Sequence, residues 1–152
     1  MEISYPFERD VVEQILPHRD PFVWVSRVIA CEPGSSITAE LDVPAELDLF
    51  RGHFPAHPVL PGVILMEALA QAASICILIE RGAEGSLGFL TGIDKAKFRN
   101  QVVPGDTVTL TAEIVRSSRR MCVAEVKAMV GDKLCASATQ KYVLADADEA
   151  SA

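Results

Sequence analysis

Residues 63–79 decide the fold, and they read VILMEALAQAASICILI. All are apolar except Glu67, Gln71 and Ser74, whose i, i+4 and i+7 spacing places them on one face of a helix. A segment of this length is at the short limit for crossing a bilayer, and a carboxylate inside it is costly in lipid. The segment therefore predicts a helix buried on nearly every side in a globular domain, with no membrane span and one narrow polar stripe.

An antiparallel sheet is predicted around this helix. Pro61-Gly62 precedes the helix, Gly82 suits its C-terminal end, and Val103-Pro104-Gly105-Asp106 is typical of a turn between strands. Alternating apolar and polar residues predict strands at 22–30, 36–43, 89–99, 107–115, 121–130 and 134–143. We expect one α+β domain over residues 1–144, in which the sheet curls round the helix, and a disordered acidic tail over 145–152.

Composition excludes several classes of function. The 152 residues carry 14 Lys+Arg and 21 Asp+Glu, and a net charge of −7 argues against nucleic acid as the main partner. The N-terminal residues show neither the basic nor the apolar segment of a secretory signal, so we expect a cytoplasmic protein. Four widely separated cysteines, without a C-x-x-C pair, predict buried free thiols and no metal site or other cofactor.

The candidate catalytic residues lie just before and inside the long helix. Three prolines and two glycines in Gly52–Gly62 make a stiff loop that holds His53 in a fixed orientation. Glu67 follows about a turn and a half into the helix, where apolar neighbours favour the protonated form of its carboxyl. A histidine base and a carboxylic acid suit proton abstraction α to a carbonyl with loss of a β-hydroxyl. From the residues alone, a structural role for either side chain stays open.

The whole chain resembles the hotdog-fold 3-hydroxyacyl-[acyl-carrier-protein] dehydratases of bacterial fatty acid synthesis. The matching motifs occur in the family's order: ILPHRDPF (15–22), VSRV (25–28), GHFP through EALAQ (52–71), GID (92–94), KFR (97–99) and VVPGD (102–106). The run from Gly-His-Phe-Pro to Pro-Gly-Val, with a glutamate five residues after its last glycine, is highly specific. Two positions depart from the family: Asp20, where an aromatic residue is common, and Ser26, where Asp is usual.

The resemblance implies a reaction and a role for each site residue. His53 would be the base that takes the C2 proton of a (3R)-3-hydroxyacyl thioester, and Glu67 of the other subunit the acid that protonates the departing hydroxyl. The backbone N–H of Gly62 would polarise the thioester carbonyl, and the carbonyl of Val59 would orient the imidazole. The product would be the trans-2-enoyl thioester, and the enzyme a hydro-lyase. A glutamate at position 67, where the isomerising branch carries Asp, favours dehydration alone.

Substrate delivery requires an apolar tunnel and a surface for the acyl carrier protein. Candidate tunnel residues are Leu65, Met66, Leu69, Phe89 and Ile93. Because the carrier is acidic, its docking requires a local basic rim. The candidate docking residues are Lys95, Lys97, Arg99, Arg116, Arg119 and Arg120. Simple core packing and a solvated surface remain the alternative interpretations of these two sets.

Assembly follows from the apolar helix. One curled sheet shields only one side of a helix, so we expect the polar stripe to pack against a second copy across a two-fold axis. The resemblance also implies this homodimer, a double hotdog with shared sites, and a trimer of dimers.

Three other functions stay open at this stage. A hotdog thioesterase has the same fold but hydrolyses the thioester. A hydratase acting on CoA esters runs the same chemistry in reverse, although its expected Pro-x-His-x-Asp arrangement is absent. A non-catalytic acyl-carrier-binding homologue of a polyketide or aryl-polyene pathway needs neither His53 nor Glu67. His18 and His57 are interpreted as structural loop histidines, and Gln71 as a hydrogen-bond partner of Glu67.

Overall fold

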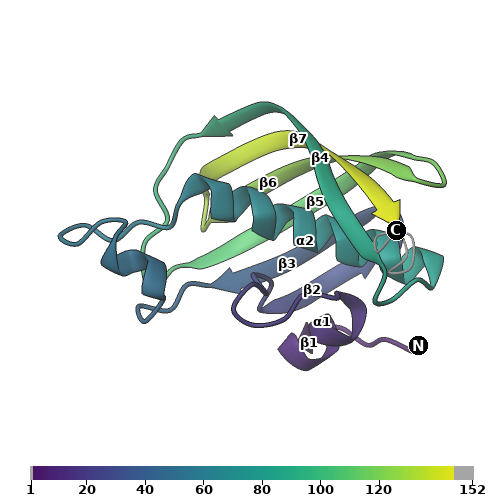
Figure 1. Cartoon of the computed structure of the whole chain (residues 1–152), viewed down its shortest axis with the longest axis horizontal. Helices are drawn as coiled ribbons and strands as arrows, with labels where there is room; N and C mark the ends of the chain where they lie inside the picture. Colours follow the sequence, from purple (N-terminus) through teal and green to yellow (C-terminus); the bar gives the residue numbers. More distant parts are fainter. Residues whose placement is uncertain (1, 146–152) are drawn as a thin grey trace.

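The computed structural model describes residues 2–145, which form a single antiparallel sheet curled around one long helix (Figure 1). The elements are β1 (Phe7–Glu8), α1 (Arg9–Ile15), β2 (Arg27–Glu32), β3 (Ser36–Asp42), the 3-10 helix η1 (Asp48–Arg51), α2 (Gly62–Arg81), β4 (Leu87–Phe98), β5 (Thr107–Ser117), β6 (Met121–Val130) and β7 (Lys133–Ala145). The seven strands follow the order β1-β2-β3-β5-β6-β7-β4. The predicted α+β hotdog architecture is confirmed.

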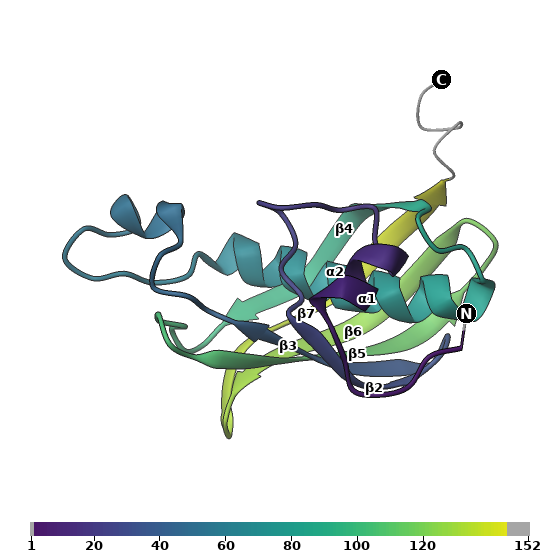
Figure 2. The same ribbon diagram turned by 90° about the horizontal axis from the view of Figure 1, so that it is seen from below.

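Helix α2 is the centre of the core. It lies in the concave face of the sheet, as the turned view shows (Figure 2), and the residues from Ala68 to Leu78 are all buried. Gly82 ends the helix in the left-handed region at φ 60°, and its N–H bonds the Ile79 carbonyl, as expected for a glycine C-cap. Within residues 2–145, α2 alone is long and apolar enough to cross a membrane, but 72% of its most apolar 18-residue stretch is buried inside the domain.

The polar stripe of α2 is covered by the chain itself, and the expectation that it faces a second copy is wrong for most of its length. Gln71 is 1% exposed and Ser74 8% exposed. The Gln71 amide bonds the backbone of Phe22 and Trp24, while Gly88 of β4 lies against the Ser74 hydroxyl. Only Glu67, with a 25% exposed side chain, keeps access to solvent.

The strand predicted at 22–30 begins only at Arg27. The Gln71 side-chain amide donates a hydrogen bond to the Phe22 carbonyl (2.9 Å), and its Oε1 accepts one from the Trp24 N–H (2.8 Å). Because these backbone groups are paired with a helix side chain, they cannot also pair in a sheet ladder. The segment before β2 is therefore a loop that runs over α2.

Strand β4 is the free edge of the sheet on one side. It pairs with β7 along its inner side, from Leu87 opposite Ala145 to Phe98 opposite Ala136. Strand β7 thus extends one residue beyond the expected domain boundary at residue 144. Residues 146–152, where the tail is expected, lie outside the described residues.

The four cysteines are free thiols. Cys76, Cys122 and Cys135 are buried, and only Cys31 on β2 is partly exposed. The expectation of buried free thiols is confirmed for three of the four.

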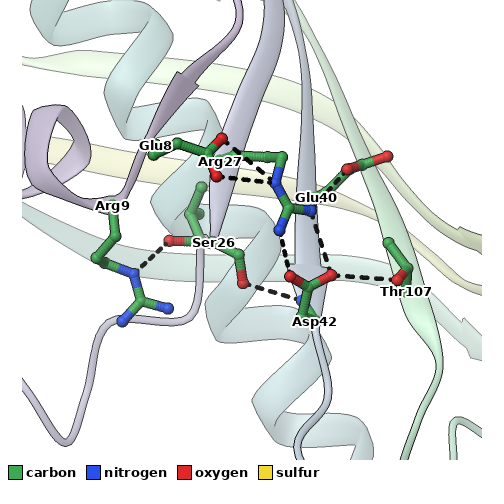
Figure 3. Close-up of polar contacts among 8 residues, drawn as sticks. Glu8, Arg9, Ser26, Arg27, Glu40, Asp42 and Thr107 are labelled. Carbon is green, nitrogen blue, oxygen red and sulfur yellow. Dashed lines mark hydrogen bonds and ion pairs between the residues drawn. The ribbon is translucent and has the colours of Figure 1, made fainter.

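Arg27 ties the first three strands together (Figure 3). Its guanidinium donates to Glu40 on the neighbouring strand at 2.8 Å, to Glu8 of β1 at 3.4 Å, and to Asp42. Ser26, where the family usually has Asp, accepts the Asp42 N–H at 2.9 Å. This departure from the family thus has a structural role beside Arg27.

We expect this cluster to make stability depend on pH. The hydrogen bond from Arg27 lowers the pKa of Asp42 below its usual value, and Thr107 adds to the effect. Because the folded-state pKa is depressed, the stabilisation is present above about pH 4 and is lost as pH falls through that lower value. Asp42→Asn should lower the free energy of unfolding by at most about 1 kcal/mol at pH 7, since the side chain is half exposed. Urea titrations at pH 7 and pH 2.5 test this, and an equal deficit at both would contradict it.

Candidate active site

His53 lies in the loop between η1 and α2, and the loop folds back on itself around it. The Val59 N–H donates to the His53 carbonyl at 3.0 Å, and the His53 Nδ1 lies 2.8 Å from the Val59 carbonyl. The Leu60 N–H bonds the Val102 carbonyl, which anchors the loop to the rest of the domain. The Phe54 ring stacks on the imidazole with centroids 4.1 Å apart. These contacts fix the orientation of the imidazole.

The contact with Val59 also fixes the tautomer of His53. A carbonyl oxygen can only accept, so Nδ1 must carry the proton and donate it to Val59. The neutral ring then has an unprotonated Nε2, which is the atom a general base requires. The expected orienting role of Val59 agrees with this geometry.

Gly62 begins α2, and its backbone N–H has no acceptor within the part of the chain described. Free N–H groups at the start of a twenty-residue helix favour negative charge nearby. A Cβ at this position would lie 2.6 Å from the Phe98 ring, so close packing against β4 requires glycine. A cavity of 370 Å³ opens beside it, lined by Val59, Leu60, Gly62, Val63, Leu65, Phe98, Asn100, Gln101 and Val102.

Glu67 has two side chains of its own chain beside its carboxyl group. The Gln71 amide donates to its Oε2 at 3.0 Å, as predicted from the i, i+4 spacing. His18, in the loop after α1, has its Nε2 3.7 Å from the same oxygen. His18 therefore lies next to the candidate acid rather than in an unrelated loop. This contact could not be predicted from local sequence patterns, because 49 positions separate the two residues.

His53 and Glu67 do not meet within the chain. Over residues 2–145, no hydrogen bond or ion pair joins the two side chains. His57, the other histidine of the loop, is exposed, and its Nε2 lies 3.0 Å from Gln101 Oε1. The expected pairing of His53 with Glu67 of a second copy therefore stays a prediction.

A buried polar pair under α2 was missed by sequence reasoning. The Tyr142 hydroxyl donates to Gln140 Oε1 at 2.5 Å, and the Gln140 amide donates to the Met66 carbonyl at 2.9 Å. Burial raises the pKa of Tyr142, so the hydroxyl keeps its proton. The signal was present: Gln140 is a polar residue on the inward face of a strand whose neighbours there are Ala136 and Ala138. The pair fixes the helix turn that carries Glu67.

The tunnel candidates are not brought together within one chain. Leu65 lines the cavity beside Gly62. Met66 and Leu69 are buried in the core, whereas Phe89 and Ile93 on β4 are 48% and 41% exposed. Only Leu65 borders the candidate site in the single chain.

The candidate docking residues form two groups rather than one. Lys95 and Lys97 lie near the Phe98 end of β4, and Arg99 directly follows it; Phe98 lines the cavity beside Gly62. Arg116, Arg119 and Arg120 lie around the β5–β6 turn, where Arg81 at the C-terminal end of α2 donates to the Arg119 carbonyl. These ends are far apart in Figures 1 and 2. Proximity in the sequence therefore failed to indicate a single patch.

The chain is similar to proteins of known activity over nearly its whole length. The family model of the FabA-like domain matches residues 16–139. The "3-hydroxyacyl-[acyl-carrier-protein] dehydratase FabZ" of Ruminiclostridium cellulolyticum is 44% identical over 136 residues, which are 90% of this chain and 96% of that protein. The Listeria monocytogenes protein of that name is 44% identical over 89% of this chain and 94% of its own length. The solved dehydratase heterocomplex ApeI:P from Xenorhabdus doucetiae has the same fold, with a TM-score of 0.79 at 19% identity, covering 91% and 93% of the two chains.

Proposed function

Because the chain belongs to the FabA-like family, we propose that His53 and Glu67 are the base and the acid of its dehydration site. The protein is a 3-hydroxyacyl-[acyl-carrier-protein] dehydratase, a hydro-lyase. The observation that carries this assignment is 44% identity over about nine-tenths of the chain. Its substrate is a 3-hydroxyacyl thioester on acyl carrier protein.

The proposed reaction moves two protons. The Nε2 atom of His53 takes the C2 proton of the (3R)-3-hydroxyacyl thioester, and Glu67 of the partner subunit gives its proton to the C3 hydroxyl. The C3–O bond breaks, water leaves, and the electrons of the C2–H bond form the trans double bond of the 2-enoyl thioester. His53 is then an imidazolium and Glu67 a carboxylate, and exchange with solvent restores both. The tautomer set by Val59 supports the role of His53.

The negative charge that develops on the thioester carbonyl oxygen must be stabilised by a hydrogen-bond donor. We assign this role to the N–H of Gly62, which is unpaired in the described chain and lies at a helix N-terminus. The adjoining cavity supports this placement, since it provides an apolar lining beside Gly62. Leu65 would contact the acyl chain there.

We propose that the active species is a homodimer formed along β4. This strand has one unpaired edge, and edges of this kind readily add a second strand. Phe89, Ile93 and Phe98 expose large apolar side chains on it, and Val63 at the start of α2 is 72% exposed. The lack of a bond between His53 and Glu67 among residues 2–145 is compatible with a site that joins His53 of one chain with Glu67 of its partner. The trimer of dimers implied by the resemblance stays a prediction, for which sedimentation velocity is the test.

A β4-to-β4 pairing would also join the two basic groups. Antiparallel pairing of two copies places the Phe98 end of one strand beside the Leu87 end of the other. Arg119 of one chain would then approach Lys97 of its partner near the site. We propose that the acidic acyl carrier protein docks on this combined surface, in the cytoplasm.

One assay tests the proposed function. The protein is incubated with a 3-hydroxyacyl-acyl carrier protein, and enoyl absorbance and free thiol are followed together. Enoyl formation without thiol release is expected, and a chelator should leave the rate unchanged. Thiol release would indicate a thioesterase, and binding without either product a non-catalytic carrier-binding protein. Faster turnover of CoA esters than of carrier-bound esters would favour a CoA hydratase.

A further inference from the structure

The loop after α1 brings a histidine to the candidate acid. Gln71 fastens this loop to α2 through Phe22 and Trp24, and His18 lies in the same loop. The His18 Nε2 is 3.7 Å from Glu67 Oε2, and the two side chains are 23% and 25% exposed. The same Oε2 atom accepts the Gln71 amide at 3.0 Å. One oxygen of Glu67 therefore has nitrogen neighbours from two elements.

The other ring nitrogen of His18 indicates which tautomer is present. His18 Nδ1 is buried and has no hydrogen-bond partner. Buried N–H donors without a partner are rarer in proteins than buried acceptors without one. The proton is therefore best placed on Nε2, where it points toward the Glu67 carboxyl. At 3.7 Å the two atoms are in contact but not hydrogen-bonded, and the proposed role requires this distance to shorten during the reaction.

We propose that His18 is a positioning residue of the dehydration site, whose neutral Nε2–H and the Gln71 amide together hold Oε2 of Glu67. With donors facing Oε2, the acidic proton must lie on Oε1, which is then directed to the departing hydroxyl. The inference rests on the proposed role of Glu67 as the acid. His18 then joins Glu67 and Gln71 as a third side chain in the part of the site that each chain would contribute to its partner.

The electrostatic surroundings of His18 agree with this role. Burial lowers the pKa of His18 below its usual value; Arg19 lowers it further, and Glu67 opposes them. The Arg19 guanidinium donates hydrogen bonds to the Leu16 and His18 backbone carbonyls. His18 is thus neutral near pH 7. A charged imidazole would instead stabilise Glu67 as a carboxylate, which has no proton to give.

Two replacements of His18 separate positioning from packing. His18→Phe keeps a ring of similar size but has no donor, and should lower kcat by about tenfold to a hundredfold with little change in KM. His18→Gln keeps an N–H donor with a different shape, and should recover most of the lost kcat. The matched control is His57→Phe, which changes an exposed histidine bonded to Gln101 and should leave kcat unchanged.

The opposite order of activities would overturn the proposal. Full activity in His18→Phe, or no recovery in His18→Gln, would assign His18 to packing alone. If His18→Phe does not fold, the ring ¹⁵N shifts of the wild-type protein decide, because they distinguish an Nε2–H from an Nδ1–H tautomer; the latter would refute the proposal. An inactive wild-type protein would refute the proposed function instead, so the two failures are distinguishable.

Discussion

His53→Ala should reduce the rate of dehydration by about 10²- to 10⁴-fold while the protein stays folded. The Nδ1–H of the His53 imidazole donates to the Val59 carbonyl, which leaves Nε2 free to act as a base. Alanine removes that base but leaves the Val59–His53 backbone bond, so the loop keeps its shape. The rate of enoyl formation at saturating substrate measures the loss.

His57→Ala is the matched control in the same loop. Its side chain is exposed and lies against Gln101, so its removal should change the rate little. Thermal unfolding of both variants establishes that they are folded. Turnover close to wild type in a folded His53→Ala protein would remove His53 from the mechanism.

Glu67→Gln should cause a loss of similar size, about 10²- to 10⁴-fold. A hydroxyl leaves as water only when an acid protonates it, and an amide has no such proton to give. The replacement has the same shape, and its carbonyl oxygen still accepts the Gln71 amide, so α2 should be undisturbed. Substrate binding should therefore persist while kcat falls.

Glu80→Gln provides the control on the same helix. Glu80 lies near the C-terminal end of α2 with a 49% exposed side chain, far along the helix from Glu67. Loss of activity in both variants would indicate a general effect of removing charge from α2. Loss in Glu67→Gln alone assigns the effect to the acid.

Elements with a strong periodic pattern were predictable from the sequence. The apolar run at 63–79 became α2 at Gly62–Arg81, and Gly82 ends it as expected. The hairpin strands β5, β6 and β7 follow the predicted alternation to within a few residues. In these segments each residue's neighbours are local or directly opposite, so the pattern contains the needed information.

Contacts between distant segments were not predictable. The loop at 22–26 has an alternating pattern like a strand, but the Gln71 side chain takes its backbone groups. The same contact covers the stripe that was expected to face a second copy. Propensity and period describe neighbours along the chain, and tertiary hydrogen bonds override them here.

In the candidate site too, contacts within one motif were predictable and contacts between distant segments were not. The Gly-His-Phe-Pro loop contains both His53 and Val59, so their contact could be expected from one motif. His18 reaches Glu67 only because the loop crosses α2. The six basic residues were expected to form one rim, but they form two groups that adjoin different ends of β4.

We propose that each site joins His53 of one chain with Glu67 of its partner, and mixing inactive chains tests this arrangement most directly. His53→Ala and Glu67→Gln chains are unfolded, combined in equal amounts and refolded, and dehydration is compared with that of each variant refolded alone. Random pairing makes half of the dimers mixed, each with one intact site, so about a quarter of the wild-type activity should return. No recovery, with mixed dimers demonstrated by native mass spectrometry, would show that each site is built within a single chain.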